Sequence, residues 1–448
     1  MDEKKSNNQV YLCIFFTALV IRVTIVLLAY NLGDSYLSPD SYDYIRLAKG
    51  LLFKHIYGTA IHPEIFRVPG YPVIISFFIL IFKNGFLISL LIFQAFIDSL
   101  TCLLVYKLSN LIFKYDKISI LAGIFQVISI LSIVYCSKIL SETIFTFMII
   151  FTLFILQRLI NKLKCNRENI RYISVIILSL FSAVLCYLRA IFLPLSIFLI
   201  IVIFIYNKKI ILSLIAIIVL FCCLGGWYIR NYEIVNYFGF SSVPSINIYR
   251  YNACALEAEK NKIAYDTQQK IIDDKLSNYS SQAQKARFSK EKGFQIIKEN
   301  PILYLYLHFK GDIKVLFPSI GELYKIFGYE VGSRGTLSVV NTKGLFAGIK
   351  HYFSDNFFLL LYALPLIIFI LLKYLVFLFA FIYLIFKKSN TERLIHIIYL
   401  IIILYFILVP GPVATPRFRV PVEPLINIYA AFGFVMIFSN LFKRKEKL

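Results

Sequence analysis

Residues 10–44 read VYLCIFFTALVIRVTIVLLAYNLGDSYLSPDSYDY, an apolar run followed by a cluster of acids and tyrosines. The apolar part, at 10–30, is long enough to cross the hydrocarbon core of a bilayer as a helix. Carboxylates next to hydrocarbon are costly, and they tend to mark sites that handle protons, ions or polar substrates. This stretch therefore predicts a membrane span that leads into a site at the membrane surface, with Asp40 at its centre.

The composition of the whole chain indicates an all-α polytopic membrane protein. Of 448 residues, 59% are hydrophobic and 17% are aromatic, and the mean hydropathy is +0.76. A soluble protein of this length would need far more polar surface. The run at 10–30 lacks a small-residue cleavage site, so we expect it to be a retained first span and not a signal peptide.

The net charge of +22 is explained by membrane topology. Lysine and arginine gather in short loops between the apolar runs, which is the positive-inside pattern of membrane proteins. The charge therefore does not indicate a nucleic acid partner. The eight cysteines are scattered and the five histidines do not cluster, so neither a disulfide framework nor a zinc site is indicated.

Threading the chain with its amino end in the cytoplasm predicts about ten spans and two cytoplasmic termini. The apolar run at 71–83 is too short to cross comfortably, so we expect an interfacial helix on the outer face. The basic loop at 162–171 is expected inside. The expected spans are about 10–30, 86–106, 118–135, 143–160, 172–188, 191–206, 210–228, one within 357–386, 394–409 and 425–442.

This topology divides the chain into three expected parts. Residues 1–228 are expected to form an amino-terminal transmembrane core, with a first external loop at 31–85. Residues 229–355 are markedly more polar, and we expect them to form an external, mainly helical region. Residues 356–448 are expected to hold the carboxy-terminal transmembrane helices.

The same topology places the unusual polar residues on the outer face, where loops distant in sequence can share a site. A departing phosphate needs fixed positive charge, and the arginine fork matches phosphate oxygens. Arg417 and Arg419, two positions apart between prolines, are expected to line such a pocket together. A carboxylate such as Asp40 or Glu142 can act as general base toward an acceptor hydroxyl. Further candidates for substrate binding are Arg67, Lys138, Arg189, Tyr44 and Tyr71.

Structural roles compete with several of these assignments. Asp40 and Glu142 each precede an expected helix, so either could be a helix cap. Arg189 lies at the end of a span and could simply reach toward lipid headgroups, and interfacial tyrosines usually anchor a protein in the membrane. Arg22 in the first span and Asp98 in the second are expected to form a buried pair, to which we assign no function.

The order of these segments resembles the bacterial branch of the GT-C membrane glycosyltransferases, which contains the protein O-mannosyltransferases and the lipid A aminoarabinose transferases. The similarity covers most of the chain, although each motif is short. The chain has a single acid at Asp40 where many members of that group have two adjacent acids, and it has Gly70 where some have a second proline. The similar segments are SPDSYDYIRLAKGLL (38–52), RVPGYP (67–72), SETIF (141–145), LRAIFLPL (188–195), WYIRNY (227–232), KENPILYLYLHFKG (298–311) and RFRVPVEPLINIYAAFGF (417–434).

The resemblance implies a site chemistry. Asp40 would be the principal catalytic acid and Glu142 a second acid of the site, while Arg417 and Arg419 would bind the phosphate of the donor. Members of the group use a polyprenyl-phosphate sugar as donor and work on the extracytoplasmic face. No cofactor is indicated, although Asp40 and Glu142 together could bind a divalent metal ion.

The sequence therefore predicts an inverting glycosyltransferase with a GT-C-like bundle in a bacterial cytoplasmic membrane. It would transfer a sugar from polyprenyl phosphate to a lipid, glycan or protein acceptor on the outer face. A transporter or flippase of a lipid-linked glycan is the alternative, because it would use similar charges to receive a headgroup. Transporters commonly show internal repeats and polar groups near the bilayer midplane, and no obvious repeat is present in this sequence.

Overall fold

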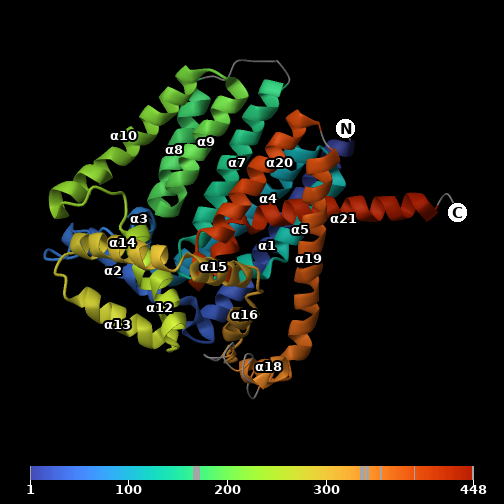
Figure 1. The fold of residues 1–448 in the computed structure, drawn as a ribbon. Coiled ribbons are helices and arrows are strands. Elements are labelled where there is room, and N and C mark those ends of the chain that lie inside the picture. Colours follow the sequence, from blue (N-terminus) through green and yellow to red (C-terminus); the bar gives the residue numbers. More distant parts are fainter. Residues whose placement is uncertain are drawn as a thin grey trace.

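The computed structural model describes residues 2–164, 172–332, 336, 339, 343–353, 356–387 and 389–445. Within these residues the regular structure is helical, apart from an isolated bridge between Gly58 and Pro63. Long helices form a bundle, and shorter helices cover one end of it (Figure 1). The all-α membrane architecture expected from the sequence is confirmed. Most of the basic loop expected inside, residues 165–171, lies outside the described residues.

Helix α4 (Phe86–Phe113) is the central element of the amino-terminal half. It packs against α1 (Asp2–Asn31), α5 (Asp116–Val127) and α7 (Glu142–Lys164). These helices are apolar along most of their length, so their faces pack against one another or against lipid. The arrangement brings the amino end of α7 close to the chain that follows α1, which is where the candidate acids lie.

A buried ion pair ties α1 to α4. The Nε atom of Arg22 lies 2.6 Å from Oδ2 of Asp98, and both side chains are almost completely buried. Arg22 also donates to the carbonyl oxygens of Gln126 and Val127 at the end of α5. Carbonyls in the last turn of a helix lack the usual partners four residues on, and a polar side chain can complete their hydrogen bonding inside a membrane. The pair expected from the sequence is therefore present.

The expected span at 118–135 is broken into two helices. Helix α5 ends at Val127, and α6 (Ile130–Cys136) continues at an angle of 48°. Ser129 lies in the break, and its backbone carbonyl accepts the first hydrogen bond of α6, from the amide of Ile133. The bend turns the chain toward the loop that precedes Glu142.

Two helices between α1 and α4 form the first loop. Helix α2 (Pro39–Lys54) is amphipathic, and α3 (Gly70–Phe82) is apolar and 13 residues long. The interfacial position expected for α3 stays a prediction, since α3 and α4 together form one apolar stretch, Gly70–Phe113. A Cβ atom at Gly70 would lie 2.5 Å from the carbonyl oxygen of Tyr187. The close packing of α3 on the end of α8 therefore requires glycine at position 70.

The remaining long helices complete the bundle. Helices α8 (Tyr172–Leu188), α9 (Leu193–Asn207) and α10 (Ile210–Val235) pack in succession beside α7, and they form the upper left of Figure 1. Helix α19 (Leu359–Lys387) packs along α21 (Glu423–Lys445), which also contacts α5. Helix α20 (Asn390–Leu408) packs on the short 3-10 helix η7 (Pro416–Val422).

Seven candidate spans pass a test of length and hydropathy within the described residues, or eight if the bent pair of α5 and α6 counts as one span. Helix α8, with 17 residues, is a shorter apolar helix, and α20 is a helix at the place of another expected span. All ten segments expected to span the membrane are thus helical, although fewer pass the test.

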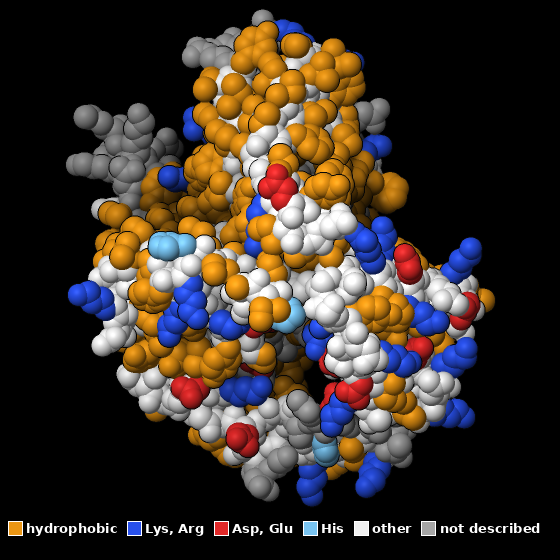
Figure 2. Space-filling view, turned by 90° about the vertical axis from the view of Figure 1, so that its left-hand side faces the viewer, with side chains coloured by type: hydrophobic (Ala, Val, Ile, Leu, Met, Phe, Trp, Pro, Cys, Tyr) orange, Lys and Arg blue, Asp and Glu red, His pale blue; other side chains and the backbone are white. Residues whose placement is uncertain are grey.

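The polar region at 229–355 is helical in its described part. It begins inside α10, which continues to Val235, and it contains a separate small core built around Tyr249, Cys254, Ile272 and Ile296. Figure 2 shows apolar side chains covering the upper part of the molecule and charged side chains gathered on the lower part. The helices of this region are α11 (Val243–Asn247), α12 (Cys254–Asn261), α13 (Tyr265–Ser277), α14 (Gln282–Glu299), α15 (Pro301–Val315), α16 (Ile320–Ile326) and α18 (Leu345–Phe353).

Candidate active site

Asp40 lies in the first turn of α2, but it does not cap that helix. Ser38 is the N-cap residue, and its backbone amide donates to the hydroxyl of Ser41 over 3.0 Å. The Ser41 hydroxyl in turn donates to the carbonyl oxygen of Ile139, over 2.8 Å. These bonds fix the start of α2 against the loop before α7, and they leave the carboxylate of Asp40 available for other partners.

Arg67, from the segment between α2 and α3, holds one oxygen of that carboxylate. Its Nη2 atom lies 2.7 Å from Oδ1 of Asp40 and 3.1 Å from Oδ2 of Asp43. Its guanidinium lies over the ring of Tyr44, with 4.8 Å between the carbon and the ring centroid. Glu64 accepts a hydrogen bond from the backbone amide of Arg67, so the loop that carries the arginine is itself held in place.

Glu142 begins α7 and is completely buried. Its Oε1 atom contacts Nε of Arg417 and lies 2.7 Å from Nη1 of Arg189. Its Oε2 atom is buried and has no hydrogen-bond partner among the described residues. A buried carboxylate oxygen without a partner is expensive, so this oxygen is well placed to accept a hydrogen bond from a substrate.

Arg417 joins the two candidate acids. Its Nη1 atom lies 2.5 Å from Oδ2 of Asp40, while its Nε atom contacts Glu142. Three arginines and three carboxylates thus alternate in one chain of contacts, which we call the charged cluster. Its members are Asp43, Arg67, Asp40, Arg417, Glu142 and Arg189.

The arginines determine the ionisation of Asp40. Burial alone would raise the pKa of its carboxyl, but Arg417 and Arg67 outweigh burial and lower the pKa to about 2. The same contacts raise the pKa of Arg67. Asp40 is therefore a carboxylate near neutral pH, and a carboxylate of such low basicity is better suited to orienting a hydroxyl or stabilising positive charge than to removing a proton. Movement of one arginine onto a substrate phosphate would raise its basicity.

The two candidate tyrosines lie beside the cluster but differ in exposure. Tyr44 packs edge to face against Tyr71, with 5.0 Å between the ring centroids. Tyr71 is completely buried, and its hydroxyl donates to Gln94 of α4 over 2.7 Å. Gln94 donates onward to the carbonyl oxygen of Lys138. In this structure Tyr71 supports Tyr44 and the loop before α7, and its contact with substrate stays a prediction.

Lys138 is turned away from the charged cluster. Its ammonium lies 2.5 Å from Oε2 of Glu322 on α16, which also accepts a bond from Lys325 over 2.9 Å. Although burial favours the protonated form of Glu322, the two lysines lower the pKa of its carboxyl. The contact ties the polar region to the loop that precedes Glu142.

Arg419 does not share a pocket with Arg417, so our expectation for this pair is corrected. In the 3-10 helix η7 successive residues are about 120° apart, and two positions therefore separate the side chains by about 240°. Arg419 is buried on the other side of η7, where its Nε atom lies 2.7 Å from Oε2 of Glu423 and its Nη1 atom donates to the carbonyl oxygen of Val315.

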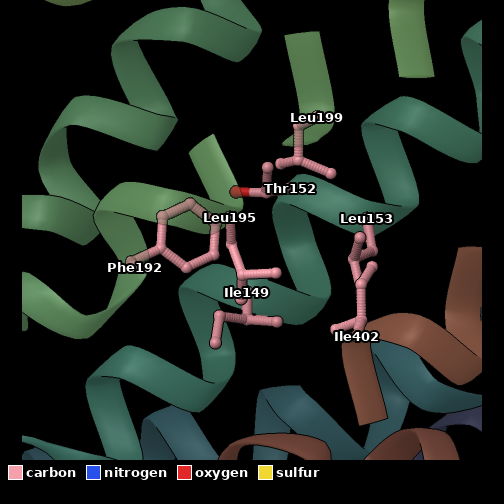
Figure 3. A pocket seen from close by; sticks show the side chains of 7 residues that line it. All are labelled: Ile149, Thr152, Leu153, Phe192, Leu195, Leu199 and Ile402. Atoms are coloured by element: carbon pink, nitrogen blue, oxygen red, sulfur yellow. The ribbon is translucent and has the colours of Figure 1, made fainter. Parts of the chain in front are cut away.

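An apolar groove begins directly below the charged cluster. The ring of Phe145 lies 5.7 Å from the Arg189 guanidinium and packs edge to face against Phe192. Phe192 is one wall of a narrow groove, shown in Figure 3, in which side chains of α7, α9 and α20 point toward one another. The other walls are Ile149, Thr152, Leu153, Leu195, Leu199 and Ile402.

The fit of a divalent metal ion to the cluster is limited by its arginines. No group of three histidine, cysteine or acidic side chains suitable for a metal occurs in the described part of the chain. Both oxygens of Asp40 are held by guanidinium groups, and Arg417 lies between Asp40 and Glu142. The arrangement therefore does not fit a metal ion that bridges Asp40 and Glu142.

Sequence reasoning missed three residues that shape the site. Asp43 shares Arg67 with Asp40, and its only signal in the sequence is its place three positions after Asp40. Gln94 could have been found from the sequence, because a polar amide within an apolar span usually has a buried hydrogen-bond partner. Glu322 carried no local signal, because its partner Lys138 lies 184 positions away.

Comparisons with known proteins identify a shared fold. No family model matches the chain, and no curated protein does. A crystal structure of the Archaeoglobus fulgidus oligosaccharyltransferase in complex with Zn and sulfate matches with 13% identity and a TM-score of 0.49. A second structure of that enzyme, tethered with an acceptor peptide containing the NVT sequon, matches with 13% identity and a TM-score of 0.52.

Both matches cover 96% of this chain and 50% of the oligosaccharyltransferase chain. The chain therefore spans about half the length of the proteins it matches, and identity at this level shows the fold alone. The helical membrane fold resembles that of an archaeal oligosaccharyltransferase, in agreement with the GT-C-type bundle expected from the sequence.

Proposed function

We propose that the protein is a membrane glycosyltransferase that transfers a sugar from a polyprenyl-phosphate donor to an acceptor. The observation that carries the proposal is the position of Arg417 between Asp40 and Glu142, with the apolar groove directly below Arg189. Such an arrangement suits a substrate with a phosphate at the membrane surface and an apolar chain in the membrane.

The donor fits this arrangement in two parts. Its phosphate would lie at Arg417 and Arg189, where two guanidinium groups offer paired donors to phosphate oxygens. Its prenyl chain would follow α7 toward Ile149 and Leu153, about 10–16 Å from Glu142 at the helical rise per residue. The walls of the groove are apolar apart from Thr152, whose hydroxyl is bonded to the carbonyl oxygen of Met148.

In the proposed reaction the bond between the sugar anomeric carbon and the phosphate oxygen breaks, and the acceptor oxygen or nitrogen bonds to that carbon from the opposite face. The electron pair of the broken bond stays on the phosphate, which the arginines stabilise. The acceptor proton passes to Asp40 once Arg417 has moved onto the phosphate, and Asp40 also stabilises the positive charge that develops on the sugar ring. The result is inversion at the anomeric carbon.

The acceptor is a lipid, a glycan or a protein, and the site would face the outside of a bacterial cytoplasmic membrane. This orientation is supported by the concentration of basic residues in the loops at the other end of the bundle. The archaeal oligosaccharyltransferase that shares this fold has been solved tethered with an acceptor peptide via a disulfide bond. The charged cluster lies at one end of the bundle and the groove below it is apolar, which favours transfer over transport.

The test is sugar transfer from a panel of radiolabelled polyprenyl-phosphate sugars by the purified, lipid-reconstituted protein. Asp40→Asn and Arg417→Ala are expected to abolish release of the sugar, with the same helical content as wild type. Asp34→Asn, the same substitution at an exposed position in the same loop, is the matched control and is expected to keep activity. Full activity in Asp40→Asn would refute the catalytic role, and movement of intact donor between leaflets without sugar release would favour the flippase alternative.

A further inference from the structure

A second groove lies on the opposite side of η7 from the charged cluster. It is a narrow groove at the break between α5 and α6, and Pro318 and Ser319 are among the residues that line it. Phe125, Ile128 and Phe369 supply apolar walls, and Ile128 is 43% exposed at the surface of the bundle. The groove thus has an apolar entrance on the side of α5 and α19.

Three ionisable side chains line this second groove. The ammonium of Lys373 contacts Glu423 and lies 3.0 Å from Oδ1 of Asn427. Arg419 donates to the other oxygen of Glu423 over 2.7 Å. All three are at least nine-tenths buried, and they lie in candidate spans that are apolar over most of their length. Two cations therefore face one carboxylate, which leaves one positive charge in excess where an uncompensated charge is costly.

Two hydrogen-bond donors that line the second groove lack a partner among the described residues. Arg419 bonds through Nε and Nη1 to Glu423 and to the carbonyl oxygens of Val315 and Phe317, and its Nη2 atom makes no hydrogen bond within the described residues. The hydroxyl of Ser129, in the helix break, is buried and has no partner there either. Both residues line the groove. An anion at this point could accept hydrogen bonds from Arg419, Lys373 and Ser129.

We propose that this groove binds the headgroup of an anionic lipid. A single negative charge, as on a phosphodiester, would balance the excess positive charge, and the acyl chains would pass between α5 and α19 over Ile128 and Phe369. The site is distinct from the donor groove, which lies between α7, α9 and α20. The proposed lipid site does not depend on the proposed transfer reaction. The 3-10 helix η7 links the two sites, because it carries both Arg417 and Arg419.

The test measures lipid binding and not turnover. Native mass spectrometry of the full chain in detergent compares phosphatidylglycerol, a monoanionic phosphodiester, with zwitterionic phosphatidylcholine. Saturable binding selective for phosphatidylglycerol is expected. Lys373→Gln removes one charge-assisted hydrogen bond and the excess charge, and it should weaken that binding about tenfold. Glu423→Gln adds an excess charge and should tighten it.

Opposite effects of these two neighbouring substitutions separate binding from folding, because a packing defect would weaken binding in both variants. Lys117→Gln, an exposed lysine at the far end of α5, is the matched control for nonspecific attraction and should leave binding unchanged. Equal binding by wild type and Lys373→Gln, or weaker binding in both variants, would overturn the proposal. Competition by soluble glycerol phosphate as strong as by the lipid would overturn the lipid assignment in favour of a small-anion site.

Discussion

Nη1 of Arg417 lies 2.5 Å from Oδ2 of Asp40, although the two residues are 377 positions apart in the chain. The contact joins the loop after the first span to the loop before the last one. It makes the carboxylate of Asp40 strongly acidic and at the same time holds the guanidinium at the mouth of the apolar groove. A phosphate that binds Arg417 would thus compete directly with Asp40 for the same donor.

Replacing Arg417 by lysine tests whether the arginine fork is required. Lysine keeps the charge, but a single ammonium cannot present separate, fixed donors to Asp40 and Glu142. We expect donor turnover to fall about 10²-fold or more, as on loss of a preorganised donor in an active site. Arg46→Lys is the control, since its exposed contact with Asp43 over 3.5 Å contributes little. Comparable turnover in both variants would contradict the bridging role.

The acidity of Asp40 predicts a pH dependence of stability. The arginines lower its pKa from an ordinary 3.8 to about 2, so the stabilisation is present above about pH 4 and is lost as the pH falls toward 2. The difference corresponds to about 2 kcal/mol of unfolding free energy. We expect Asp40→Asn to lack this part of the acid sensitivity when unfolding is followed by circular dichroism in detergent. Identical curves for wild type and variant would exclude the ion pairs as a source of stability.

Substitution by alanine is expected to lower the stability of the protein at Gly70 but not at Gly85. A Cβ at Gly70 would meet the carbonyl oxygen of Tyr187 at 2.5 Å, whereas one at Gly85 would meet nothing within 4 Å. Gly70→Ala should therefore destabilise the protein by about 1–3 kcal/mol, the usual cost of overpacking. Gly85→Ala should be nearly neutral. Thermal unfolding of both variants checks this, and a neutral Gly70→Ala would show that α3 does not pack closely on α8.

The contact of Lys138 with Glu322 predicts energetic coupling between the polar region and the loop before α7. A double-mutant cycle with Lys138→Met and Glu322→Gln should give a coupling free energy of about 1 kcal/mol. Hydrogen exchange of α16 is expected to increase in both single variants and no further in the double variant. Additive effects would mean that α16 is held by its apolar contacts alone.

The apolar groove predicts selectivity for the length of the lipid chain. Leu199→Trp would fill the groove, and it should raise the KM for a long-chain polyprenyl donor with little change for a short-chain analogue. Ile201→Trp, on the same helix but 50% exposed, is the matched control and should change neither value. Equal loss with both donors in Leu199→Trp would indicate that the chain binds elsewhere.

Much of the architecture was predictable from local sequence. The apolar runs predicted the long helices because a helix must bury or expose its apolar face to lipid along its whole length. The short run before Lys83 predicted a separate helix, which is α3, and Arg22 and Asp98 were expected to pair because neither is stable alone in hydrocarbon. The break at Ser129 was not predicted, since the polar serines around it are compatible with a continuous helix.

The sequence predicted which residues belong to the candidate site better than it predicted which of them form ion pairs. Asp40, Glu142, Arg67, Arg189 and Arg417 were identified because charged residues at the ends of spans are few and costly. Their pairing, and the separation of Arg419 from Arg417, depended on the 3-10 geometry of η7 and on packing between distant helices.

By itself the sequence determined that the protein is an all-helical membrane bundle. It also determined at which end of the bundle the charged cluster lies, because hydropathy and charge act locally along the chain. Only the tertiary structure decided that Arg417 bridges Asp40 and Glu142, that Arg419 is buried on the other side of η7, and that a groove leads from Arg189 into the bundle. These features arise from contacts between residues far apart in sequence, which no local pattern encodes.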